Sequence, residues 1–153
     1  MATKHRMLVP VLLATVLGAA GWPAASAAAE HTPVTGTVVE RSLEPVVFSG
    51  QASITSRVIH DTDFGAPPVM ELIVDLGGVT ARGMRSGRAY QVQKEAIVRR
   101  PLQSFEQVEI GISFAPQGDV TQARSALASF GVRYSEAGGL KATPLKVEPH
   151  PPS

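Results

Sequence analysis

From Val34 onward, apolar and polar side chains alternate with a period of two residues. Between Val46 and Val58 the apolar or small residues share one parity, and polar residues such as Thr55 and Arg57 occupy the other. Successive side chains on a strand point to opposite faces of the sheet, so this rhythm predicts a strand with one face buried. The same rhythm recurs over residues 69–76, 90–99 and 105–114.

Turn-forming residues separate these stretches. Pro67-Pro68, Gly77-Gly78, Ser86-Gly87 and Pro116-Gln117-Gly118 each interrupt the alternation, and such residues are typical of loops and tight turns. Antiparallel strands with one polar face, joined by short turns, build sandwiches and barrels rather than βαβ folds. We therefore predict a mainly β fold, an antiparallel β-sandwich or open barrel of about seven strands.

One segment near the C-terminus breaks this rhythm and favours a short α-helix. Asp119 and Gln122 have the spacing of a capping box, and Gly131 is a typical C-terminal stop. Between them, four apolar residues recur along one helical stripe: Val120, Ala123, Leu127 and Phe130. We expect a helix of about eleven residues here, followed by a closing hairpin around residues 137–139.

The first 29 residues have the pattern of a cleavable secretory signal peptide. Lys4, His5 and Arg6 precede an apolar stretch over residues 7–20, and a tract of small residues runs from Ala24 to Ala29. This order matches the charged, apolar and cleavage regions of a secretory leader. The apolar stretch is shorter than the roughly 20 residues that a spanning helix needs. We expect cleavage after Ala27 or after Ala29.

Residues 30–147 are then expected to form a single β-rich domain, and residues 148–153 a disordered, proline-rich tail. Loss of Lys4 and Arg6 with the leader leaves 12 basic residues against 13 acidic ones, a net charge of −1. No overall basic character remains, so we expect no nucleic-acid partner. No later segment is apolar enough for a transmembrane segment after signal cleavage.

The chain contains no cysteine. This excludes disulfides, a thiol nucleophile and cysteine-ligated metal centres. A cysteine-free chain with a secretory leader fits an exported bacterial protein, periplasmic or secreted. The sequence calls for no cofactor.

The segment His60-Asp61-Thr62-Asp63 is the first candidate site. A histidine and two carboxylates lie where a strand runs into a loop, so His60, Asp61 and Asp63 are candidate metal ligands. Hard cations prefer six or more oxygen ligands, and this segment supplies fewer. The alternative is a turn in which the aspartate side chains bond their own backbone.

A basic cluster is the second candidate. Arg82, Arg85, Arg88 and Arg100 lie close together in the sequence with Lys94 and Arg99 between them. Such a patch is suited to anionic envelope surfaces. The alternative is a solvated strand face whose charges keep the sheet edge from pairing.

Catalytic patterns are weak by comparison. The chain has no Gly-x-Ser-x-Gly and no Ser-x-x-Lys motif, and a triad would depend on His60 alone. We therefore expect a non-enzymatic binding, assembly or envelope-associated module, which meets an unidentified partner through open strand edges. A metal-binding protein using His60, and a binder of anionic surfaces using the arginines, are the alternatives.

Overall fold

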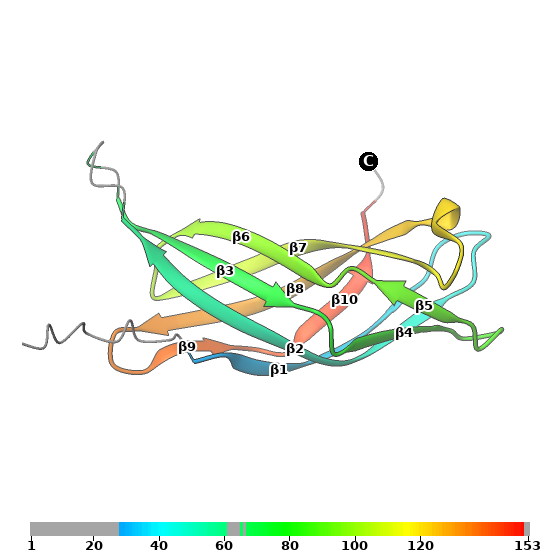
Figure 1. Ribbon diagram of the computed structural model, residues 1–153, viewed down its shortest axis with the longest axis horizontal. Helices are drawn as coiled ribbons and strands as arrows, with labels where there is room; N and C mark the ends of the chain where they lie inside the picture. The colour runs from blue at the N-terminus through cyan, green and yellow to red at the C-terminus, as the bar shows by residue number, and fades with distance from the viewer. Residues whose placement is uncertain (1–27, 61–64, 66, 152–153) are drawn as a thin grey trace, which may run out of the picture.

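A computed structural model describes residues 28–60, 65 and 67–151 of the chain, and nearly all of this part is β-strand (Figure 1). The sheet has ten strands and one 3₁₀ turn. In chain order they are β1 (Glu30–Val38), β2 (Val46–Ile59), β3 (Val69–Asp75), β4 (Val79–Gly83), β5 (Ala89–Val92), β6 (Glu95–Pro101), β7 (Phe105–Pro116), η1 (Val120–Gln122), β8 (Arg124–Ser135), β9 (Gly139–Ala142) and β10 (Leu145–Pro149).

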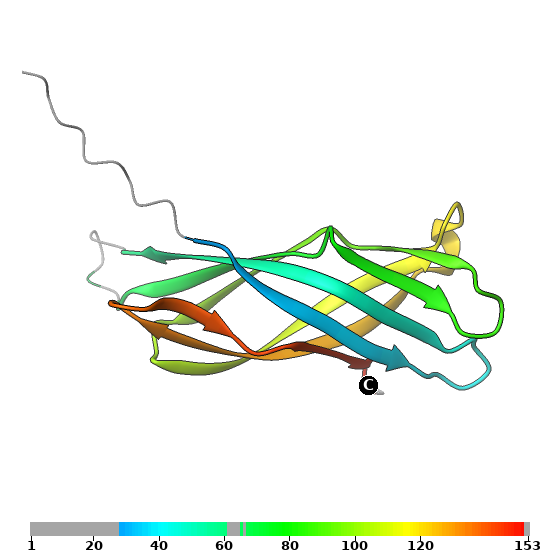
Figure 2. The same cartoon turned by 90° about the horizontal axis from the view of Figure 1, so that it is seen from below.

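Seven of these strands close into a barrel. They follow each other in the order β1-β10-β8-β7-β5-β4-β2, and β2 pairs again with β1. Each pairing in this ring is antiparallel except that of β1 with β10. The prediction of a mainly β fold is confirmed. The barrel is closed, however, whereas the sequence predicted a sandwich or an open barrel. The reason is that β1 lies between β2 and β10 and joins what would be two sheets (Figure 2).

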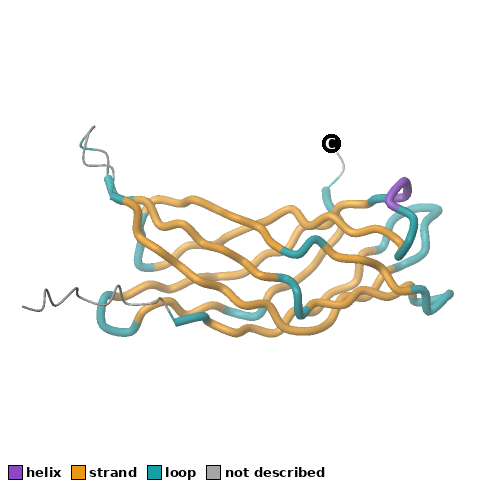
Figure 3. The backbone as a smooth tube through the Cα atoms, in the orientation of Figure 1, coloured by secondary structure: helices purple, strands orange, loops and turns teal. Residues whose placement is uncertain are grey.

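Three strands extend beyond this ring. β3 pairs with β2, β6 pairs with β3, and β9 pairs with β8. We call the end of the barrel where these three strands lie the open end; His60 and the turn at residues 136–138 also lie there. We call the other the closed end, where the loops 39–45 and 84–88 gather with η1, the only helical turn in the described part (Figure 3).

A bulge separates β4 in the ring from β3 in the extension. Gly50 pairs with Val79 and Ser53 with Asp75, so two residues of β2 lie opposite three residues, 76–78. One extra residue of this kind twists and bends a strand. Gly50 has φ +131°, and a Cβ there would lie 2.2 Å from the Gly78 carbonyl oxygen. Only glycine fits this close approach.

A second bulge separates β10 from β9. Val132 pairs with Ala142 and Ser129 with Lys146, so one strand again carries one residue more than its neighbour. At this point Thr143 replaces the ladder bonds. Its N–H donates to the Gly131 carbonyl at 2.9 Å, and its Oγ1 accepts from the Gly131 N–H at 2.8 Å.

The barrel interior is filled by the apolar parity that the sequence predicted. In β2 the buried residues are Val46, Phe48, Ala52 and Ile54, all on one face. In β7 they include Val108, Ile110, Ile112 and Phe114. Phe48 and Phe114 meet edge to face with ring centroids 5.0 Å apart, and Tyr90 lies 5.9 Å from Phe114. Edge-to-face contact is a favourable arrangement for aromatic rings, and it fixes the core near the closed end.

The predicted α-helix near residue 120 is wrong. Only Val120–Gln122 form a 3₁₀ turn, and residues 124–135 are strand β8. Asp119 does cap the turn, because its side chain accepts from the Thr121 N–H. From Ala126 to Val132 every second residue is buried. Pairing with β7 along its length outweighs the short helical stripe.

The other predicted strand stretches are confirmed. The 90–99 stretch is split into β5 and β6, and the closing hairpin is β8–β9. β10 continues to Pro149, so Glu148 and Pro149 belong to a strand. Of the predicted 29-residue leader, residues 1–27 lie outside the described residues.

Candidate functional site

A cavity of about 560 Å³ opens between β2 and β9 at the open end. The pairing of β1 with β2 begins at Glu30 and Ile54, so β2 has no neighbour on that side from residue 55 to 59 in the described part. β9 pairs only with β8 there. Two strand edges with unpaired backbone groups therefore face each other across the cavity.

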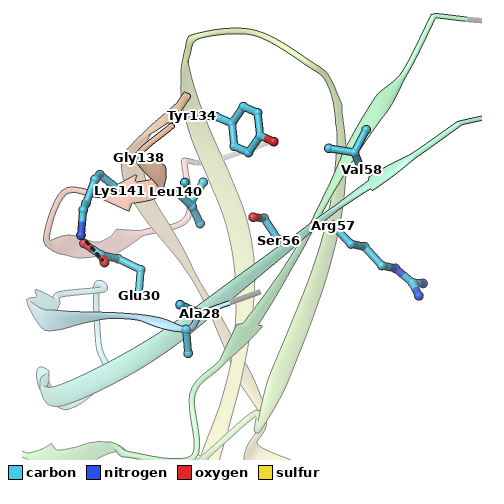
Figure 4. Close-up of a pocket in the computed structure, with 11 residues that line it drawn as sticks. Ala28, Glu30, Ser56, Arg57, Val58, Tyr134, Gly138, Leu140 and Lys141 are labelled. Atoms are coloured by element: carbon cyan, nitrogen blue, oxygen red, sulfur yellow. Dashed lines mark hydrogen bonds and ion pairs between the residues drawn. The ribbon is translucent and has the colours of Figure 1, made fainter. Parts of the chain in front are cut away.

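The side chains inside the cavity come from the inward parity of these strands. Figure 4 shows the Ser56 hydroxyl and the Tyr134 ring pointing into the space, with Val58 and Leu140 on its sides. Leu140 is 8% exposed and packs against the core. The cavity thus combines an apolar surface with two hydroxyl groups, the composition typical of a binding pocket.

An ion pair forms the rim of the cavity. Lys141 Nζ donates to Glu30 Oε2 at 3.2 Å, linking the start of β1 to β9 (Figure 4). Thr32 makes a second link, donating from Oγ1 to the Thr143 carbonyl at 3.0 Å. Side chains, rather than a backbone ladder, therefore hold β1 to β9 and to Thr143, the residue that follows it.

Arg57 points away from the cavity to the outer face of the sheet. Its Nε donates to Glu71 at 2.5 Å, and Arg99 Nε donates to the other Glu71 oxygen at 2.8 Å. These three are direct partners across β2, β3 and β6. The two arginines leave Glu71 only 2% exposed. Their hydrogen bonds, first that of Arg99 and then that of Arg57, lower the pKa of Glu71.

Of the three predicted metal ligands, the structure describes His60. His60 is exposed and follows the end of β2, whereas Asp61 and Asp63 lie outside the described residues. Within residues 28–60, 65 and 67–151, no three His, Asp or Glu side chains are grouped to hold a metal ion. The hypothesis stays a prediction. Calcium or zinc at a hundred times the dissociation constant would stabilise the fold by about 2.7 kcal/mol, and His60→Ala would abolish that shift.

The structure gathers three of the four predicted anion-binding arginines and separates the fourth. Arg82, Arg85 and Arg88 lie on or beside the β4–β5 hairpin at the closed end, whereas Arg100 is on β6, paired with Met70 at the open end. Arg82 donates to the Gly87 carbonyl and Arg85 to the Leu43 carbonyl. Anion binding stays a prediction, tested by salt-sensitive retention on heparin.

Two residues that sequence reasoning missed hold the closed end together. Glu44 accepts hydrogen bonds from the Ser86 N–H and hydroxyl and from the Arg85 N–H, which lower its pKa. Arg124 is 10% exposed, donates to the Glu44 carbonyl at 2.9 Å and lies 5.1 Å from the centre of the Phe114 ring. No local signal marks either residue, because their hydrogen-bond partners are 41 to 80 positions away.

The cavity residues carried a weak signal. Ser56 is a polar residue on the apolar parity of β2, and Tyr134 follows Val132 on the inward parity of β8. Polar groups on an inward face need a partner or an opening.

In the part of the chain that the structure describes, no helix is long and apolar enough to cross a membrane. Comparison with family models, with curated proteins and with solved structures finds no match to this chain.

Proposed function

We propose that this protein is a non-enzymatic binding module that receives an extended peptide segment between β2 and β9. The observation that carries the proposal is the pair of unpaired strand edges on either side of the cavity. A strand added to an open edge gains main-chain hydrogen bonds, and a pocket beneath it selects the side chain. Residues 55–59 offer room for about five residues of partner.

The chemistry of the cavity suggests what the partner presents. Val58 and Leu140 would contact one apolar side chain of the peptide, and the hydroxyls of Ser56 and Tyr134 would meet its backbone or a polar neighbour. The Glu30–Lys141 pair, with both signs of charge at the rim, favours neither an acidic nor a basic partner.

The same proposal places the protein outside the cytosol, periplasmic or secreted. Both predicted cleavage positions, after Ala27 and after Ala29, come before β1 begins at Glu30. Removal of the leader would leave every strand of the barrel intact. The partner would then be another protein of the bacterial envelope or its surroundings.

Selection from a library of displayed peptides, using the processed protein, tests this function. Selected peptides should slow amide exchange at residues 55–59 and 139–142. Ser56→Tyr would fill the cavity and weaken binding by about tenfold or more, the loss of about 1.4 kcal/mol. Thr55→Tyr is the matched control, because the neighbouring side chain points to the opposite face.

The proposal fails if no peptide is selected. It also fails if Ser56→Tyr binds the selected peptides as tightly as the unmodified protein does.

A further inference from the structure

The outer edge of β6 offers a second surface, distinct from the cavity. β6 pairs with β3 along residues 95–101 and, in the described part of the chain, with no strand on its other side. The neighbouring β7 pairs with β5 over residues 90–92 and 114–116, and Gln93 continues this contact by bonding to Ser113. No ladder then joins β7 to β6 in the described part of the chain. An unpaired edge of this length is a template for pairing with another chain.

Edge strands are usually protected from pairing by charged side chains, and the outer face of β6 departs from this pattern. Ile97 is 57% exposed and lies near the middle of the strand, flanked by Glu95 and Arg99 on the same face. Charged residues at the ends of an edge discourage pairing, but here an exposed apolar side chain occupies the middle. The charges on its two sides are of opposite sign.

This order is self-complementary under a two-fold axis. If two copies of β6 run antiparallel with Ile97 opposite Ile97, Glu95 of each copy lies opposite Arg99 of the other. On the inner face, Ala96 then lies opposite Val98. Directly opposed apolar pairs and opposite charges each stabilise an antiparallel ladder, and no like charges meet over residues 95–99. One step beyond them Lys94 would lie opposite Arg100, which confines the favourable pairing to residues 95–99.

The charges within one copy favour the same arrangement. Glu95 is the direct cross-strand partner of Asp75, so two exposed carboxylates lie side by side. No described cation forms an ion pair with either one. Like charges at this spacing destabilise a sheet. Arg99 from a second copy would offset part of this repulsion, while its Nε keeps its bond to Glu71.

We propose that β6 is a homodimerisation edge, on which a second copy of this chain pairs antiparallel through residues 95–99 in the register centred on Ile97. The interface is small, so the dimer forms at micromolar concentrations or above. Its two exposed Glu95–Arg99 pairs make it weaker at high salt.

Sedimentation of the processed protein at about 100 µM should detect this dimer. Ile97→Lys places two like charges opposite each other and should raise the dissociation constant by about tenfold or more. Val39→Lys is the matched control, because Val39 is 58% exposed and lies outside β6.

A cysteine substitution tests the register directly. The chain has no cysteine of its own, and directly opposed residues bring their Cα atoms within disulfide range. Oxidised Ile97→Cys should form linked dimers several times faster than Val39→Cys. A protein that stays monomeric, or a dimer that Ile97→Cys does not link, overturns the proposal.

Discussion

The two ends of this barrel are built from the same strands but are completed in different ways. At the closed end, β4, β5 and β7 have neighbours on both sides, and Glu44 and Arg124 bond the surrounding loops to one another. At the open end, β6, β9 and the last residues of β2 each have one neighbour. The change occurs at the two bulges, near residues 76–78 and 143–144.

This difference identifies the strand edges that have no neighbour in the described part of the chain. Backbone groups inside the closed ring are already paired with neighbouring strands. Most of those on the edges at the open end have no strand partner in the described part of the chain, and an edge of this kind can accept another strand. Both proposed interactions, the peptide at β2–β9 and the second copy at β6, therefore belong to the open end.

Amide hydrogen exchange should separate the two regions most strongly. Amides of β8 and of residues 46–50 in β2 should exchange only through global unfolding, which costs about 5–15 kcal/mol in small domains. Amides of β6 and β9 that face away from their one neighbour should exchange with opening free energies near zero. The measurement needs dilute protein, so that β6 is unpaired. Uniform protection would contradict the comparison.

Core truncation should be costlier near the closed end. Phe114 is 2% exposed and contacts Phe48, Tyr90 and Arg124, so Phe114→Ala should destabilise the fold by about 3–5 kcal/mol. Val58→Ala in the half-exposed cavity wall should cost about 1 kcal/mol. Urea denaturation measures both, and equal losses would remove the distinction between the ends.

The bulge at Thr143 should show an intermediate effect. Thr143→Val leaves the buried Gly131 N–H without its acceptor, at a cost of about 1–3 kcal/mol. Thr80→Val is the control, because its hydroxyl bonds are exposed and should contribute less than about 0.5 kcal/mol. Indistinguishable melting temperatures for the two variants would refute the role of this side chain.

The smallest effect should come from the ladder of Arg57, Glu71 and Arg99. In the folded state the pKa of Glu71 is below its ordinary value of 4.5. The ionised Glu71 carboxylate therefore stabilises the fold at pH values above 4.5. The contribution is lost as the pH falls through the folded-state pKa. The melting temperature of Glu71→Gln should therefore lie below that of the unmodified protein near neutral pH and approach it in acid. A difference in melting temperature that stays the same at every pH would contradict this role of the Glu71 carboxylate.

Local pattern was a reliable guide to strands and to their buried faces. The alternation around Phe48 and around Ile110 predicted the inward parity that the structure has. It failed at residues 119–130, where a capping residue and four spaced apolar side chains fit a helix as well as a strand. The deciding factor there is the partner β7, whose Val108 lies opposite Phe130.

The candidate site was less accessible to such reasoning. Ser56 carried a hint as a polar residue on an apolar parity, but its neighbours in the cavity come from β8 and β9, about 80 positions later. The paired acids Asp75 and Glu95 are likewise invisible until the register of β3 and β6 is known.

The amino-acid sequence alone was enough to establish strands with one buried face, since that property follows from the two-residue geometry of a single extended segment. The closure of the barrel by β1 and the unpaired edges of β2, β6 and β9 became evident from the strand pairing of the folded chain. Those outcomes depend on which distant strands meet and in which register, and no local pattern of side chains encodes that choice.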